Sequence, residues 1–148
     1  MSRQYVIFSL EEQLYAVDIS IVSEITEIKD ITKVPHSVEG MEGVLNLRGK
    51  VIPIINLKRK MNMQATKNGN QILVIEHFDK LIGLIIDQAK DVKVISDENI
   101  ENIETSINNR SESNVKYVIK DVNKQLILII DILTMFKNIE DNELFLLA

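Results

Sequence analysis

Few side chains in this sequence have the types and spacing that catalysis or metal binding would require. His36 and His77 are the only histidines, and neither has a second ligand at a spacing typical of a metal site. Asp87 and Asp91 could share a cleft as an acid–base pair, because like charges held close together raise the pKa of a carboxyl group. Each aspartate also stands where an apolar run ends, a position in which aspartates commonly make local hydrogen bonds. The residues therefore favour neither catalysis nor metal binding, although a small hydrolase or ligand-binding barrel that uses the two aspartates stays open as an alternative.

Sequence motifs of the common cofactor and nucleotide sites are missing as well. The chain contains no Gly-x-Ser-x-Gly elbow, no phosphate-binding loop and no dinucleotide fingerprint. It has no cysteine, which excludes disulfides and thiolate metal sites and fits a reducing compartment. We therefore expect a protein that is not an enzyme and that binds no cofactor.

Charge and hydropathy argue against two classes of partner. The net charge is −5 and the isoelectric point about 5.1, whereas nucleic-acid binders usually carry a concentrated basic face. The densest basic cluster, residues 58–60, is interpreted as a solvated segment after a strand. No apolar run approaches the roughly 20 residues that span a bilayer, and the N-terminus lacks the pattern of a signal peptide. We expect a cytoplasmic, soluble protein with no nucleic-acid partner and no direct membrane insertion.

The apolar residues predict a β-rich fold. Hydrophobic residues make up 45% of the 148 positions but aromatic residues only 5%, so the core must consist mostly of Ile, Leu and Val, which favour strands. Short apolar runs separated by polar turns pair into four hairpins: residues 5–10 with 14–17, 44–47 with 51–57, 71–78 with 81–86, and 115–120 with 125–131. Ile85 and Ile129 lie in runs that are apolar on both faces, which predicts core positions. With a further strand at 91–95, the total of about ten short strands without a βαβ rhythm predicts an all-β domain of barrels.

Helices are expected to be few and short. Asp18 can cap a helical segment over residues 19–25, where apolar residues recur at three-residue spacing. Further helical turns are predicted at residues 58–61 and 97–100, and a C-terminal helix from Ile132 towards residues 144–147. Polar composition predicts loops at residues 35–42, 62–70 and 96–114.

The stretch from Gly43 to Leu57 is the most distinctive part of the chain. Arg48, Gly49 and Lys50 form the turn between its two strands, and Gly49 permits a positive φ there. From the residues alone, the two cations could simply belong to a solvated turn. However, the pattern Gly-Val-x-Asn-Leu-Arg-Gly-x-Val-x-Pro-Ile-x-x-Leu resembles the signature of CheW-type chemotaxis coupling proteins. Segments 15–25, 31–35 and 83–92 are also similar to that family, so the resemblance covers most of the chain.

The resemblance implies a fold and a function. The implied fold is mainly β, with two five-stranded SH3-like β-barrels around a shared apolar core, in one domain over residues 1–148. The barrels would cover roughly residues 15–80 and 81–135, with terminal strands crossing between them. The implied function is that of a non-enzymatic adaptor coupling chemoreceptor cytoplasmic tips to the regulatory domain of the histidine kinase CheA. The adaptor would be recruited to membrane-associated receptor arrays, with ring or array assembly alongside CheA. An adaptor of a non-flagellar chemosensory system is the alternative within the class.

The resemblance also assigns partner-binding positions, which make or support contacts in the family: Val22, Glu24, Gly43, Arg48, Gly49, Gly83 and Val92. For Val22 and Glu24 the residues alone allow a simpler interpretation, a core valine and a solvated carboxylate. The sequence departs from the family at three places: Ala16 replaces a common Gly, Asn56 a common Asp, and the turn at residues 121–124 has no Gly. Asn123 could supply the left-handed conformation in that last turn. Because the chain ends at Ala148, we expect no attached receiver domain.

Overall fold

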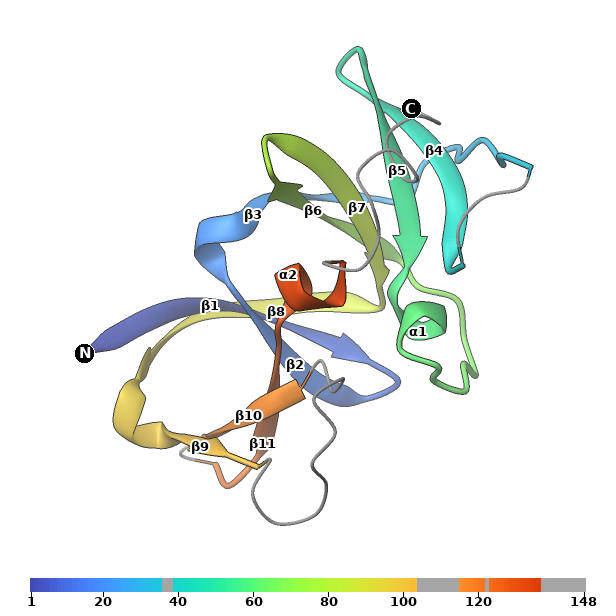
Figure 1. Ribbon diagram of the computed structural model, residues 1–148. Coiled ribbons are helices and arrows are strands. Elements are labelled where there is room, and N and C mark those ends of the chain that lie inside the picture. The colour runs from blue at the N-terminus through green and yellow to red at the C-terminus, as the bar shows by residue number, and fades with distance from the viewer. Residues whose placement is uncertain (36–38, 104–114, 122, 137–148) are drawn as a thin grey trace.

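The computed structural model describes residues 1–35, 39–103, 115–121 and 123–136, except for the side chain of His77. In this part of the chain, strands dominate and form two sheets (Figure 1). The six-stranded sheet has the order β8-β1-β2-β11-β10-β9, and the five-stranded sheet has the order β3-β6-β7-β5-β4. The strand bounds are β1 Ser2–Leu10, β2 Gln13–Asp18, β3 Val22–Glu27, β4 Met41–Leu47, β5 Lys50–Asn56, β6 Gln71–His77, β7 Lys80–Ile86, β8 Gln88–Ser96, β9 Ile100–Asn102, β10 Val115–Lys120 and β11 Leu126–Ile130.

In each sheet, the two edge strands follow one another directly in the sequence, so that a short connection closes the sheet on itself. In the six-stranded sheet, the edge strands β8 and β9 are consecutive and are connected by the 3₁₀ turn η2, Asp97–Asn99. In the five-stranded sheet, the edge strands β3 and β4 are likewise consecutive. The segment between them returns to β4, where Thr32 and Val44 exchange backbone hydrogen bonds of 2.9 and 2.8 Å. This closure fits the mainly β, barrel-like fold that we expected, although β9 makes the first sheet six-stranded rather than five-stranded.

The chain passes between the two sheets at two points. The first crossing is the 3₁₀ turn η1, Ile19–Ile21, between β2 and β3. The second is Asp87, between β7 and β8. Strand pairing thus places the strands between residues 22 and 86 in the five-stranded sheet and the flanking strands in the six-stranded sheet.

The principal core lies where the two sheets pack on each other. Alternate residues of β1 point in opposite directions: Val6, Phe8 and Leu10 enter this shared core, whereas Tyr5 and Ile7 point into the six-stranded sheet's own interior. The five-stranded sheet contributes Leu73 and Leu84, among others, to the same shared cluster. The short helix α2, Ile132–Met135, and the following Phe136 complete it. Burial on both faces explains the nearly continuous apolar strands.

The predicted helix over residues 19–25 is wrong beyond its first turn. Asp18 does cap a turn, because its carboxylate accepts a hydrogen bond of 2.9 Å from the Ser20 N–H. From Val22 onward the chain is strand β3, which pairs with β6. The β-branched residues of this segment suit a strand, and the free edge of β6 offers backbone partners that local three-residue spacing cannot reveal.

The other elements follow the predictions closely, with small differences. All four hairpins are confirmed, as are helical turns at α1, Leu57–Lys60, and at η2. Strand β9 was not predicted, since it sits in a polar segment and forms by backbone pairing with β10. In the last hairpin turn Lys124, not Asn123, has the positive φ of 63°. Beyond α2, the predicted helical continuation at 144–147 lies outside the described residues, as does most of the loop predicted at residues 96–114.

The two predicted core isoleucines differ in burial, which gives a stability test. Ile85 is 8% exposed within an apolar cluster, whereas Ile129 is only half-buried. Ile85→Ala should therefore lower the free energy of unfolding by about 2–5 kcal/mol, through lost transfer energy and a residual cavity. Ile129→Ala should cost clearly less. Urea denaturation of both variants measures the difference, and equal losses would contradict this account of the core.

Candidate functional site

The two charged candidates of the partner-binding set, Glu24 and Arg48, lie against each other. Arg48 occupies the two-residue turn between β4 and β5 with a φ of +54°, and Glu24 lies on β3. The Arg48 Nη2 donates to Glu24 Oε2 at 2.6 Å. Because β3 and β4 are the two edges of one sheet, this ion pair connects the β4–β5 hairpin tip with the opposite edge strand. The Arg48 side chain nevertheless stays 79% exposed, so a second molecule could reach it.

The three candidate glycines have conformational and packing roles that the structure makes plain. Gly49 has a φ of +86° and donates its N–H to Asn46 Oδ1 at 2.9 Å, which holds the turn beneath Arg48. Gly43 is buried, and a Cβ there would lie 2.1 Å from the carbonyl oxygen of Thr32. Gly83 is buried as well, and its Cβ would lie 2.5 Å from Ile54 Cδ1. Gly43 and Gly83 can therefore affect a partner only through the packing of the sheet beneath the surface.

The two candidate valines lie on edge strands of different sheets. Val22 is half-buried against the shared core and pairs with Ile75 of β6. Val92 lies on β8, an edge strand of the six-stranded sheet, where it is exposed opposite Val6. The structure therefore brings Val22, Glu24, Arg48 and Gly49 to one sheet and leaves Val92 on the other.

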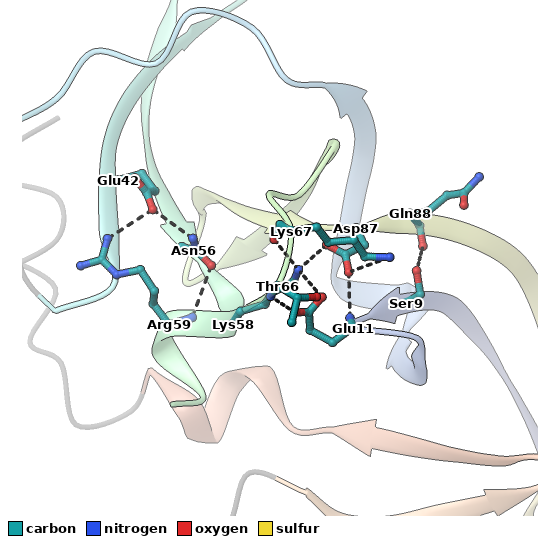
Figure 2. Close-up of polar contacts among 10 residues, drawn as sticks. All are labelled: Ser9, Glu11, Glu42, Asn56, Lys58, Arg59, Thr66, Lys67, Asp87 and Gln88. Carbon is teal, nitrogen blue, oxygen red and sulfur yellow. Dashed lines mark hydrogen bonds and ion pairs between the residues drawn. The ribbon is translucent and has the colours of Figure 1, made fainter. Parts of the chain in front are cut away.

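A buried charged cluster, formed by Glu11, Lys58 and Asp87, holds the second crossing between the sheets (Figure 2). Lys58 is only 2% exposed, and its ammonium lies 2.7 Å from Asp87 Oδ1 and 3.1 Å from Glu11 Oε2. It also donates to the carbonyl oxygen of Lys67 at 2.9 Å. Asp87 Oδ2 in turn accepts from the Glu11 N–H at 2.7 Å, and the Thr66 N–H donates to Glu11 Oε1. The cluster thus joins the β1–β2 turn, α1, the loop after it and the crossing itself.

The cluster changes the ionisation of its members. Hydrogen bonding from the Thr66 N–H, helped by Lys58, holds the pKa of Glu11 at about 2, below its usual 4.5. Burial by itself would lower the pKa of Lys58, but the hydrogen bonds and charges of Asp87 and Glu11 outweigh burial and raise it. Glu11 and Lys58 are therefore held in their charged forms, as the low exposure of the Lys58 ammonium requires.

The interpretation of residues 58–60 as a solvated segment is wrong for Lys58 and holds in part for the exposed Arg59. Lys58 is buried as just described, while Arg59 Nη1 contacts Glu42 Oε1 at 3.2 Å and so ties α1 to β4 (Figure 2). Asn56 caps the helix by accepting from the Arg59 N–H at 3.3 Å and donates to the same Glu42 oxygen at 3.0 Å. The Lys60 ammonium lies 5.7 Å from the centre of the Phe136 ring, within the range of a cation–π contact. These cations brace α1 against its surroundings.

The structure does not support an acid–base pair of Asp87 and Asp91. Both border a recess of about 630 Å³. However, Asp87 is buried in the charged cluster, and Asp91 Oδ1 accepts the N–H of Val92 at 2.8 Å on an exposed strand. Among the described residues, no group of three or more His, Cys, Asp or Glu could hold a metal ion. Of the two histidines, His36 lies outside those residues, and His77 ends β6.

Comparison with known proteins gives one consistent result. The family model of the CheW-like domain matches residues 4–140 of this chain. "Chemotaxis protein CheW" of Treponema pallidum is 32% identical over 143 residues, which cover 93% of this chain and 84% of that protein. The protein of the same name from Bacillus subtilis is 27% identical and covers 86% of this chain and 83% of the relative. In the crystal structure of the scaffolding protein TtCheW from Thermoanaerobacter tengcongensis, the chain is 31% identical in sequence, and the TM-score is 0.83 over 98% of this chain and 99% of that one.

Within the described residues, no helix has both the length and the apolar character that a membrane span requires.

Removing the buried ammonium should destabilise the fold strongly. Lys58→Met leaves two carboxylates without their cation, and we expect a loss of about 3–5 kcal/mol in the free energy of unfolding. The double variant Lys58→Met, Asp87→Asn should recover part of that loss, since the amide that replaces the carboxylate is neutral and its oxygen could still accept from the Glu11 N–H. Arg59→Met, at the exposed neighbour, should cost less than about 1 kcal/mol. Additive effects of the two cluster substitutions in urea denaturation would contradict the coupling.

Acid should remove the contribution of Glu11. Because the folded pKa of Glu11 is about 2 and its ordinary value is 4.5, its contribution is complete above pH 4.5 and is lost as the pH falls towards 2. Urea midpoints of the wild type and of Glu11→Gln should therefore differ at pH 6 and converge as the pH approaches 2. A difference that stays constant across this range would show that the Glu11 carboxylate is not held ionised by the fold.

Proposed function

The chain belongs to the CheW-like domain family, and on this premise we propose that it is a non-enzymatic chemotaxis adaptor of one domain. It couples chemoreceptors to the histidine kinase CheA by binding the receptor cytoplasmic tips and the regulatory domain of the kinase. The observation that carries this proposal on the chain itself is the ion pair of Glu24 and Arg48, which the family resemblance marks as partner-binding positions and which lies at the surface.

Arg48 has the properties of a binding arginine. Its contact with Glu24 uses Nη2, and the remaining donors of the planar guanidinium can grip carboxylates or carbonyl oxygens of a partner. The ion pair also holds the side chain in one place before binding, which reduces the entropy lost when a partner arrives.

We propose that the two partners bind on opposite sides of this ion pair. We assign Val22 and Glu24, on β3, to the kinase side, and Arg48, with Gly49 beneath it, to the receptor side. Val92 extends the binding surface on the other sheet, while Gly43 and Gly83 support it from within. In this arrangement a receptor signal can reach the kinase through one small rigid domain.

The proposed setting follows from the same role. The adaptor works in the cytoplasm, is recruited to membrane-associated receptor arrays, and assembles with CheA in rings or arrays. It needs no cofactor, because its work is binding. A non-flagellar chemosensory system would use the same surfaces, and the identity of the kinase that binds decides between the two systems.

The direct test is calorimetric titration of the purified chain against two probes: the regulatory domain of the CheA-type kinase and a receptor tip fragment from the same genome. We expect saturable binding of both. Absence of binding to every such kinase domain and receptor fragment would overturn the proposal.

Arg48→Glu should weaken receptor binding while the domain stays folded. The turn needs Gly49 for its geometry but does not need an arginine, so the thermal midpoint should change little. Truncation of a hot-spot arginine typically costs at least about 2 kcal/mol of binding, which is roughly thirtyfold in affinity. Kinase binding should be partly preserved. Lys50→Glu, a neighbouring exposed cation in the same hairpin, is the matched control and should leave receptor affinity nearly unchanged.

A charge swap separates a bracing role from a binding role. In the double variant Glu24→Arg, Arg48→Glu the ion pair can re-form with reversed sign. Continued loss of receptor binding in this folded variant would mean that the partner contacts the guanidinium at position 48. Full recovery of binding would mean that Arg48 acts only by bracing β3, and unfolding of Arg48→Glu itself would make the residue structural.

A further inference from the structure

The loop between α1 and β6 contains the only Asn-Gly pair of the sequence, formed by Asn68 and Gly69. An asparagine that precedes a glycine is especially prone to lose its side-chain amide, because no Cβ on the next residue hinders attack by the backbone nitrogen of that residue. No other asparagine in the chain is followed by glycine. The surroundings of the pair decide whether this reactivity survives folding.

The reacting groups of this pair stay unbonded in the folded chain. Asn68 is exposed and lies in neither a helix nor a strand. Within the part of the chain that the structure describes, neither the Asn68 amide nor the Gly69 N–H makes a hydrogen bond. Asn56 differs, because its side-chain amide accepts from the Arg59 N–H and donates to the Glu42 carboxylate. Folding thus holds the Asn56 amide in place and leaves the Asn68 amide free to turn towards the next backbone nitrogen.

The backbone on both sides of Asn68, in contrast, is held firmly. On the N-terminal side, the carbonyl oxygen of Lys67 accepts a hydrogen bond of 2.9 Å from the buried ammonium of Lys58 (Figure 2). On the C-terminal side, Gly69 packs so closely on β7 that a Cβ there would lie 2.6 Å from the carbonyl oxygen of Ile86. The N–H of the next residue donates to that same oxygen at 3.0 Å. The fold therefore requires glycine at position 69, and the link through Asn68 joins two fixed points.

We propose that Asn68 is a site of spontaneous deamidation and isomerisation, and that the reaction loosens the junction between the two sheets. The Gly69 nitrogen attacks the Asn68 Cγ, the bond from Cγ to Nδ2 breaks, and ammonia leaves with the proton of the Gly69 amide, so that a succinimide ring forms. Water then opens the ring. Cleavage of the bond between the ring nitrogen and Cγ gives aspartate, whereas cleavage of its bond to the main-chain carbonyl carbon gives isoaspartate. In isoaspartate the main chain runs through Cβ and Cγ and is one carbon longer.

The longer main chain destabilises this loop because both of its ends are held. An added carbon between Lys67 and Gly69 displaces one of the two flanking contacts. Displacement of Gly69 breaks its packing on β7, and displacement of Lys67 withdraws a carbonyl oxygen from the buried Lys58 ammonium. Isoaspartate therefore lowers the stability of the domain. Aspartate at the same exposed position adds only a solvated carboxylate, which costs little.

The test follows the purified chain during incubation at mildly alkaline pH, below its thermal midpoint. Peptide mapping by mass spectrometry, with fragmentation that distinguishes isoaspartate from aspartate, should show loss of ammonia at Asn68 before any other asparagine, with isoaspartate among the products. The rate should rise with pH, because the attacking nitrogen must lose its proton. The urea midpoint of the aged chain should fall. Asn68→Gln, in which a larger ring must close, is the matched control and should keep both its amide and its urea midpoint.

A freshly prepared Asn68→Asp variant separates the added charge from the longer main chain, and its urea midpoint should match that of the fresh wild type. Deamidation of Asn68 no faster than that of Asn56 would overturn the site. An aged chain that carries isoaspartate at position 68 but keeps its urea midpoint would overturn the effect on the junction, as would a fresh Asn68→Asp variant as unstable as the aged wild type. No readout involves a receptor or a kinase, so the inference stands or falls separately from the adaptor function.

Discussion

The buried ammonium of Lys58 is the constraint on which the arrangement of the two sheets depends. A lysine removed from water needs its charge compensated, and here two carboxylates and a carbonyl oxygen converge on it. These groups come from the β1–β2 turn, the loop after α1 and the crossing at Asp87. Satisfying one charge therefore fixes the positions of segments from both sheets. Apolar packing favours contact between the sheets but, being non-directional, specifies their relative placement less sharply.

The crossing at Asp87 is reinforced by ordinary backbone contacts around the cluster. The Asp87 N–H donates to the carbonyl oxygen of Ser9 at 3.1 Å, and the Ser9 hydroxyl donates to that of Gln88 at 3.4 Å (Figure 2). On the outer side of α1, Arg59 and Asn56 share Glu42, and on the other side Lys60 lies near Phe136. The short helix thus connects three parts of the molecule. A junction held by several polar contacts suits an adaptor, because a domain that yields between its two halves would transmit little from one partner to another.

Much of the fold could be predicted because it follows from local patterns. Apolar runs and polar turns placed the hairpins, and Asp18 marked its cap correctly. The errors arise where distant segments decide the structure. Residues 22–25 form a strand because β6 offers a free edge, and β9 forms because β10 does. Lys58 appeared to be one of three similar cations, and only the fold brings Glu11 and Asp87 to it. The one sign of this charged cluster in the sequence was the carboxylate of Asp87, which directly follows a run buried on both faces.

The positions of the candidate site came from the family resemblance and not from local patterns. Resemblance named seven positions, and the structure separates them by physical role: Glu24 and Arg48 meet at the surface, Val22 and Val92 lie at strand edges, and Gly43 and Gly83 are required by close packing.

The central claim is that one rigid domain joins two partners, and simultaneous binding tests it most directly. A labelled receptor tip fragment would be titrated with the adaptor, first alone and then with the adaptor saturated by the kinase regulatory domain. The account predicts that the receptor fragment binds the saturated adaptor and forms a ternary complex with nearly the same affinity. Displacement of one partner by the other, with no ternary complex at any concentration, would contradict it.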